Sequence, residues 1–222
     1  MCLTAPGPGG NAADSFGLHT LRLVNALEQV RSALSESIRV KQELLESSAE
    51  EIARAAEEVL AAFQRHRKVL LFGNGGSAAD AAHIASEWVG RYRGERMALP
   101  AIALTANPSE LTAVANDYGY EQVFVRGIEA HGEAGDVVLV LSTSGNSPNV
   151  LVAAEAARQR GLFTIGLTGK GGGQLAGAVD LAIRVPSDDT PRIQEAHIAI
   201  GHALCEVVDE AYRVDERRQG SV

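Results

Sequence analysis

The chain has 222 residues and a formal net charge of -8, from 20 Lys and Arg against 28 Asp and Glu. Such a length suits one domain, or one domain with an appendage, and it can bury a sizeable core. The acidic balance argues against non-specific nucleic-acid binding, and no apolar run reaches the ~20 residues of a membrane span. Because the N-terminus also lacks a signal-peptide pattern, we expect a soluble cytoplasmic protein that binds neither nucleic acid nor membrane.

The N-terminal segment differs in composition from the rest of the chain. Residues 1–15 are rich in Pro, Gly and Ala, which predicts a disordered tail, and we assign residues 16–222 to a single domain. Cys2 and Cys205 are too few for a disulfide framework. Cys205 lies in an apolar helical pattern, so we expect it to be a small core residue.

The segment from Gly17 to Arg67 has a helical pattern, with no glycine or proline after Gly17. We predict two helices here, with a break near residues 35–37 and a possible internal cap in "SSAEE" (47–51). These helices lie outside the sheet-forming region and would need a partner surface. A homo-oligomer is the simplest source of that surface, so we expect the N-terminal helices to be used in oligomerisation.

After Lys68 the pattern changes to short apolar runs that alternate with helical segments. The runs predict strands at residues 69–72, 101–104, 137–141, 163–167 and 181–185, and a last helix is predicted at about 191–212. Strands that are apolar on both faces are typical of a parallel sheet covered on both sides. The predicted fold is therefore a three-layer α/β sandwich of flavodoxin-like or Rossmann-like type, with a five-stranded parallel sheet plus the N-terminal helices.

Ligands in such sheets bind at the carboxyl ends of the strands. The first strand is followed by "GNGGSA" (73–78), which fits G-x-G-x-x-A, the dinucleotide-binding pattern. That interpretation needs an acidic residue at the end of the second strand, where the chain has Thr105 and Asn107 and no acid before Glu110. A P-loop is a poorer match, because Gly-Lys-Ser/Thr is missing.

The third strand is followed by "STSGNSPN", which has hydroxyls at Ser142, Thr143, Ser144 and Ser147. Pro148 suits the first position of a helix, and hydroxyls beside free helix N–H groups can bind one phosphate group. The alternative is a capped turn with Ser147 as N-cap, although a cap needs only one hydroxyl.

The segment after the glycine loop has His83 and Glu87 four residues apart, on one face of a predicted helix. They could provide a general base or two metal ligands, or they could form a solvated pair. The last helix offers Gln194, Glu195, His197 and His202. Gln194 and His202 would be about 12 Å apart along an ideal helix, so spacing alone does not select His202.

The "AND" at residues 115–117 precedes a predicted turn at Gly119. Asn116 and Asp117 could bind sugar hydroxyls or could simply form the turn.

Together, "FGNGGSAADAAHIASEWVGRY", "AVANDYGYEQVF", "LSTSGNSPNV" and "RIQEAHIAIGH" resemble the sugar isomerase (SIS) domain family, over about Ser48 to Tyr212. The resemblance implies a homotetramer with active sites at subunit interfaces. It also implies conversion of D-sedoheptulose 7-phosphate to D-glycero-D-manno-heptose 7-phosphate through an enediol, for heptose synthesis. Matching motif to motif, Glu87 takes the place of the family's base and His202 that of its acid.

The same matching gives a ligand set. The resemblance implies that zinc, present in some members, binds at His83, Glu87, Gln194 and His202. It implies substrate binding at Asn74, Gly75, Gly76, Ser77, Glu87, Asn116, Asp117, Ser142, Thr143, Ser144, Ser147 and Gln194. The residues do not decide between chemistry with the metal and chemistry without it. The alternative function is a non-catalytic SIS protein that binds a protein partner, such as a replication initiator.

Overall fold

The computed structural model describes residues 25–169 and 171–213, so the predictions for residues 1–24 lie outside the described part of the chain. Its first element is α1 (Ala26–Gln64), a single helix of 39 residues. The predicted break near residues 35–37 and the internal cap at 47–51 are therefore wrong. Serine is only a mildly unfavourable helix residue, and Ser37 is buried with its hydroxyl 2.5 Å from the Lys41 ammonium. Without glycine or proline, nothing in this stretch ends the helix.

The five predicted strands form one parallel sheet in the order β2-β1-β3-β4-β5. Their bounds agree with the apolar runs to within one residue: β1 (Val69–Gly73), β2 (Ala101–Ala103), β3 (Val137–Leu141), β4 (Phe163–Thr168) and β5 (Leu181–Arg184). The remaining helices are α2 (Gly76–Val89), α3 (Pro108–Tyr118), the 3₁₀ turn η1 (Tyr120–Gln122), α4 (Val123–His131), α5 (Pro148–Gln159), α6 (Leu175–Ala178) and α7 (Thr190–Tyr212).

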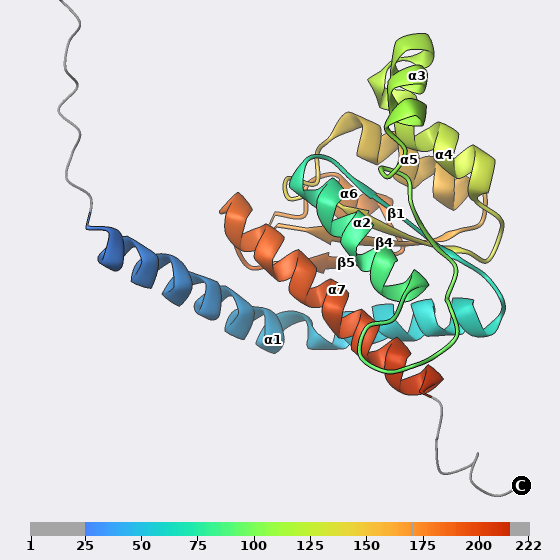
Figure 1. Cartoon of the computed structure of the whole chain (residues 1–222). Helices are drawn as coiled ribbons and strands as arrows, with labels where there is room; N and C mark the ends of the chain where they lie inside the picture. Colours follow the sequence, from blue (N-terminus) through green and yellow to red (C-terminus); the bar gives the residue numbers. More distant parts are fainter. Residues whose placement is uncertain (1–24, 170, 214–222) are drawn as a thin grey trace, which may run out of the picture.

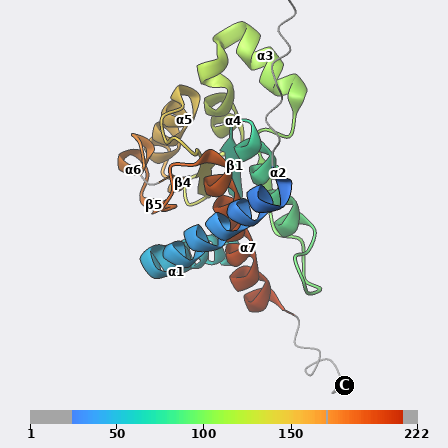
Figure 2. The ribbon, with the colours of Figure 1, turned by 90° about the vertical axis from the view of Figure 1, so that its left-hand side faces the viewer.

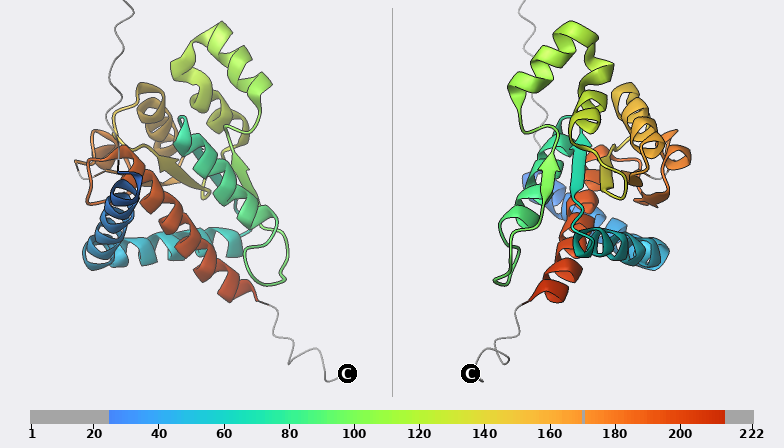
Figure 3. Two further views of the ribbon diagram at one scale, coloured as in Figure 1. Left: turned by 60° about the vertical axis from the view of Figure 1, so that its left-hand side comes forward. Right: turned by 90° about the vertical axis from the view of Figure 1, so that its right-hand side faces the viewer.

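The sheet separates two apolar clusters, which confirms the three-layer architecture. Alternate strand residues point to opposite faces, so Val69 and Leu71 pack with α1, α2 and α7, whereas Leu70 and Phe72 pack with α4 and α5. Figure 3 shows these layers from two sides. On the first face α1 lies across α7, as Figure 2 shows. Consequently α2 and α7, the two helices with the candidate histidines, share one face of the sheet.

Helix α3 is the exception to this close packing. None of its residues is buried, and Figure 1 places it at the outer end of the molecule, beyond α4. It begins at an Asn107 cap and ends at Gly119, whose φ of 89° favours glycine. The helix extends over Asn116 and Asp117, so these residues precede the turn.

Two smaller expectations can also be compared with the structure. Cys205 is 1% exposed and belongs to the first apolar cluster, which confirms it as a core residue, and burial raises the pKa of its thiol to about 12. Among residues 25–169 and 171–213, no helix is long and apolar enough to span a membrane.

Candidate active site

The turn after β1 brings backbone donors to the carboxyl edge of the sheet. Gly75 has a φ of 57°, a conformation that a side chain would strain, and α2 begins directly after it. Gly76 is the first residue of α2, and a Cβ at this position would lie 2.3 Å from Nε2 of Gln194. A side chain at residue 76 would therefore displace Gln194. No side chain caps the start of α2, where the N–H groups of Ser77 and Ala78 donate instead to the backbone carbonyls of Asn74 and Gly75.

His83, Glu87 and His202 come together from α2 and α7 within one chain. His83 Nε2 lies 3.1 Å from His202 Nε2 and 3.4 Å from Glu87 Oε1. The Tyr92 ring lies beside His202, with the ring centroids 5.5 Å apart. The prediction that His83 and Glu87 share a helix face is confirmed. The convergence of His202 depends on how α7 crosses α2, which its spacing from Gln194 did not reveal.

Gln194 lies at the opposite end of this helix pair, against Gly76. Two regions of α7 thus contact α2: Gln194 at the glycine turn and His202 about two turns further on. The distance between Gln194 and His202 therefore does not require a second subunit to bring His83, Glu87 and His202 together.

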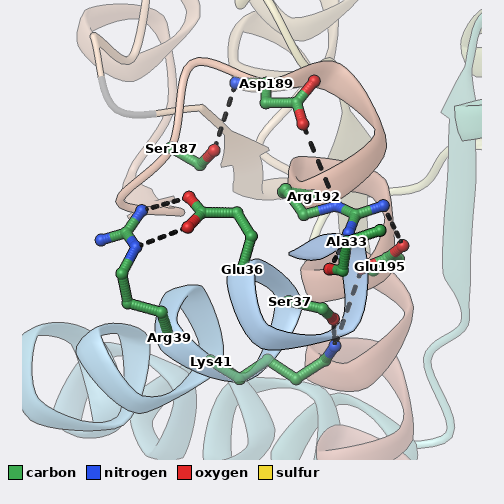
Figure 4. A network of polar contacts seen from close by, with 9 residues as sticks. All are labelled: Ala33, Glu36, Ser37, Arg39, Lys41, Ser187, Asp189, Arg192 and Glu195. Atoms are coloured by element: carbon green, nitrogen blue, oxygen red, sulfur yellow. Dashed lines mark hydrogen bonds and ion pairs between the residues drawn. The ribbon is translucent and has the colours of Figure 1, made fainter. Parts of the chain in front are cut away.

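The first turn of α7 is fixed by polar contacts with α1 (Figure 4). The Arg192 guanidinium donates to the carbonyl of Ala33 and also pairs with Glu195, at 2.7 Å. Lys41 Nζ lies 4.0 Å from the other Glu195 oxygen. Since Arg192 and Glu195 flank Gln194 in the sequence, these contacts set its position over α2.

The loop after β3 has polar groups that the protein uses only in part. The backbone N–H of Gly145 donates to Ser142 Oγ at 3.2 Å, and that of Asn146 donates to Ser144 Oγ at 3.2 Å. Ser147 occupies the N-cap position of α5, but its side chain makes no capping hydrogen bond. The capped-turn interpretation is therefore right about the position of Ser147 and wrong about its hydroxyl, which stays available to a ligand.

A second polar cluster, which sequence reasoning missed, surrounds Asn74. Its side chain forms a reciprocal amide pair with Asn149, with distances of 2.9 and 3.0 Å. The Tyr120 hydroxyl donates to Asn74 Oδ1 at 3.0 Å. By contrast, Asn116 Nδ2 bonds to Asp117 Oδ1 at 2.8 Å, and both residues are exposed on α3. Within the described residues neither of them has a hydrogen bond to the rest of the site.

The C-terminal end of α2 is held by Arg96. Its guanidinium donates to the carbonyls of Glu87, Trp88, Gly90 and Met97 and to Asp209 Oδ1, at 2.9 Å in the last case. Asp209 belongs to α7, so this cluster joins the ends of α2 and α7. Burial opposes ionisation of Asp209, but the N–H groups of residues 94 and 93 and the Arg96 guanidinium outweigh it and lower its pKa.

Two further ionisable groups on these helices are perturbed by burial. Burial raises the pKa of Asp80, against the opposing charge of His83, and Asp80 Oδ2 has no partner among the described residues. His197 is fully buried, and burial lowers its pKa to about 4. The Thr168 backbone has the opposite, smaller effect and raises the pKa. His197 is therefore a neutral core residue and not part of the site. Asp80 lies one turn before His83, a spacing that could have been noticed in the sequence.

Comparison with known proteins gives a consistent result. Residues 34–169 match the model of the SIS domain. The phosphoheptose isomerase of Rhodospirillum rubrum is 58% identical over 160 residues, which are 72% of this chain and 85% of the relative. The structure of the phosphoheptose isomerase from Neisseria gonorrhoeae has a TM-score of 0.79 at 45% identity, covering 83% of this chain and 98% of that one. For the Francisella tularensis phosphoheptose isomerase the TM-score is 0.81 at 38% identity, covering 84% and 100%.

The chain therefore belongs to the SIS-domain family, and its five-stranded sheet is that family's fold. The identity and coverage of its relatives place it further among the phosphoheptose isomerases, so it is an isomerase. Membership of this family also argues against the dinucleotide-binding interpretation of the glycine turn.

Proposed function

We propose that this chain interconverts D-sedoheptulose 7-phosphate and D-glycero-D-manno-heptose 7-phosphate through an enediol. The observation that favours it most is the convergence of His83, Glu87 and His202 in one chain, with His83 Nε2 3.1 Å from His202 and 3.4 Å from Glu87. The relatives named phosphoheptose isomerase supply the substrate class.

In this proposal Glu87 moves the carbon-bound proton. The carboxylate takes a proton from C1, and the electrons of the broken C–H bond form the C1–C2 double bond of the enediol. Returning the proton to C2 completes the conversion of ketose to aldose. The Glu87 side chain is 22% exposed, so it is partly shielded from water and still accessible to a sugar. General-base catalysis of this kind contributes about 10²–10⁴-fold.

His202 moves protons on the oxygens. It donates a proton to O2 as the carbonyl becomes a hydroxyl, and it accepts the O1 proton as the aldehyde forms. Two Nε2 atoms 3.1 Å apart form a hydrogen bond only if one of them is protonated and the other is not. In the metal-free site the His83–His202 pair thus holds one exchangeable proton beside Glu87, as acid–base isomerisation requires; zinc bound to both Nε2 atoms would replace this proton.

The phosphate group is assigned to the loop after β3. The hydroxyl of Ser147 makes no capping bond, and those of Ser142 and Ser144 each accept a single N–H. Hydroxyls beside the N-terminus of α5 suit a dianion, because the first N–H groups of a helix have no helical acceptor. Binding the phosphate far from C1 and C2 supplies energy that orients the reacting carbons.

Zinc is a further part of the proposal, with His83, Glu87 and His202 as the ligands that lie together in this chain. Gln194, the fourth ligand that the resemblance implies, lies about two turns of α7 away, against Gly76, and does not reach these three side chains. Two imidazoles and a carboxylate are zinc donors, and adjacent donors of a tetrahedral site lie about 3.3 Å apart. The separations of 3.1 and 3.4 Å from His83 Nε2 match this value. In residues 25–169 and 171–213, however, no three His, Cys, Asp or Glu side chains surround a common point. A bound zinc would act as a Lewis acid towards a substrate oxygen.

Metal analysis of the purified protein tests this part separately. We expect about one zinc per chain and a lower melting temperature after chelation. Metal content and melting temperature that do not differ from those of a His83→Ala, His202→Ala variant would contradict the zinc site.

We also propose that the chain forms a homotetramer. Helix α1 exposes an apolar stripe formed by Leu27, Val30, Leu34, Ile38 and Leu45. An apolar cavity of about 350 Å³ lies between α1 and α7, lined by Leu45 among others. Apolar surface of this kind on one helix is typical of an interface between subunits. Light scattering should give the tetramer mass for the unmodified chain and a smaller one for Leu34→Glu; a monomeric unmodified chain would contradict the assembly.

The function is tested by NMR of the purified protein with D-sedoheptulose 7-phosphate in heavy water. We expect the aldose to appear with deuterium at C2, because the carbon-bound proton exchanges on the base, and we expect little reaction with unphosphorylated sedoheptulose. A folded protein that gives no aldose, with or without added zinc, would refute the proposal and favour a protein-binding role.

A further inference from the structure

The amide cluster around Asn74 joins three segments that are far apart in the sequence. Asn74 lies in the glycine turn, Asn149 in the first turn of α5, and Tyr120 in η1. Asn149 is buried, at 3% exposed, whereas Tyr120 is 59% exposed. The cluster therefore connects the turn that begins α2 and the end of the phosphate loop to the exposed α3–η1 segment.

A count of donors and acceptors shows what the tyrosine contributes. An amide oxygen can accept two hydrogen bonds, and an amide nitrogen can donate two. Asn74 Oδ1 accepts from Asn149 Nδ2 at 3.0 Å and from the Tyr120 hydroxyl at 3.0 Å, so both of its positions are filled. Asn74 Nδ2 donates once, to Asn149 Oδ1, which leaves one N–H without a protein acceptor among the described residues.

The amide pair alone does not fix this arrangement. If both amides turned by 180°, they would pair equally well, and Asn74 would keep a free oxygen position in place of a free N–H. A phenol is a better hydrogen-bond donor than acceptor, so the Tyr120 hydroxyl favours the orientation in which it meets Oδ1. Its effect is to leave Asn74 with a donor for a ligand.

We propose that Tyr120 is a positioning residue, which orients the Asn74 amide so that its N–H faces a sugar or phosphate oxygen of the substrate. This inference rests on the proposed function and on the expectation, from the family resemblance, that Asn74 binds the substrate. A structural role explains the contact less well, because neither α3 nor η1 has a buried residue and the Tyr120 ring is largely in solvent. The hydroxyl is thus expected to affect binding and not folding.

The test is steady-state kinetics of Tyr120→Phe, with Tyr118→Phe as the matched control. Tyr118 is also 59% exposed, and its ring contact with Arg126 survives loss of the hydroxyl. We expect Tyr120→Phe to raise KM by about three- to tenfold, the effect of one hydrogen bond, with kcat changed less than about twofold and the melting temperature unchanged. Tyr118→Phe should match the unmodified protein.

A double-variant cycle decides whether Tyr120 acts through Asn74. Adding Tyr120→Phe to Asn74→Ala should cause no further rise in KM, because the amide it orients is gone. Equal KM values for Tyr120→Phe and the control, or a full additional effect in the Asn74→Ala background, would overturn the inference. Those outcomes leave the unmodified protein active, whereas failure of the proposed function would abolish turnover in the unmodified protein and the control as well.

Discussion

The two sides of the candidate site are built differently. On the α2–α7 side, Glu87 and His202 lie on helices that are packed against the sheet and joined at their ends by Arg96 and Asp209. On the α3–η1 side, Asn116 and Asp117 lie on a helix with no buried residue. Proton transfer needs groups fixed to within a fraction of an ångström, whereas a segment that contacts sugar hydroxyls can be held more loosely.

This difference leads to separate expectations for variants of each side. Substitutions on the α2–α7 side should affect either the chemical step or the stability of the fold, depending on whether they remove a reacting group or a support. Substitutions on α3 should affect substrate binding while the free energy of unfolding stays nearly constant, because few native contacts are lost.

The largest effect is expected for Glu87→Gln, which removes the base and keeps its shape. We expect kcat to fall by about a thousandfold, while the melting temperature and binding of the phosphosugar change little. Exchange of the C1 proton with heavy water, followed by NMR, measures the step directly. Turnover within tenfold of the unmodified protein would exclude Glu87 as the base.

The next effect is on stability. Arg96→Ala would leave Asp209 buried without its cation, because the side chains of Arg96 and Asp209 are 1% and 9% exposed. It would also leave the carbonyls of Glu87 and Trp88 without the guanidinium donor. We expect the free energy of unfolding to fall by about 3–5 kcal/mol in urea titrations. Arg93→Ala is the control, because its ion pair with Glu206 is exposed and should contribute less than about 1 kcal/mol. Equal losses of unfolding free energy for the two variants would contradict a special stabilising role of Arg96 at the end of α2.

The sequence predicted the sheet well because parallel strands buried on both faces must be apolar throughout. It predicted the His83–Glu87 pair because an i, i+4 spacing fixes two side chains on one helix face. The predicted break near residues 35–37 is wrong, because Ser37 is compatible with a buried position in a continuous helix.

The rest of the site depends on tertiary contacts that leave no local pattern. His202 meets His83 only because α7 crosses α2 at that point. Asn149 and Tyr120 reach Asn74 from segments that are 75 and 46 residues away in the sequence. No periodicity or spacing rule connects such positions, so these contacts could not have been derived from one sequence.

A smaller effect is expected from the buried histidine of α7. The pKa of His197 is about 4 in the folded protein, below its ordinary value of 6.5. Between these two values the unfolded chain binds a proton that the folded chain does not, so the free energy of unfolding falls as the pH falls through this window. The free energy of unfolding changes by at most about 1.4 kcal/mol per pH unit from this histidine, and above pH 6.5 the contribution of His197 is constant. Urea titrations at pH 7 and pH 5 should therefore differ less for His197→Leu than for the unmodified protein, and equal differences would exclude His197 as the source.

The smallest change in stability is expected on α3, where the loss should instead appear in binding. Asn116→Ala removes an exposed amide whose hydrogen bond in the structure is to its neighbour Asp117. The free energy of unfolding should change by less than about 0.5 kcal/mol, while KM for the phosphosugar rises and kcat changes less. Ser109→Ala, in the first turn of the same exposed helix, is the control and should leave KM unaltered. A fall in stability comparable to that of Arg96→Ala would mean that α3 is a structural element. An unchanged KM would remove Asn116 from the substrate site. Either result would contradict the proposed difference between the two sides of the site.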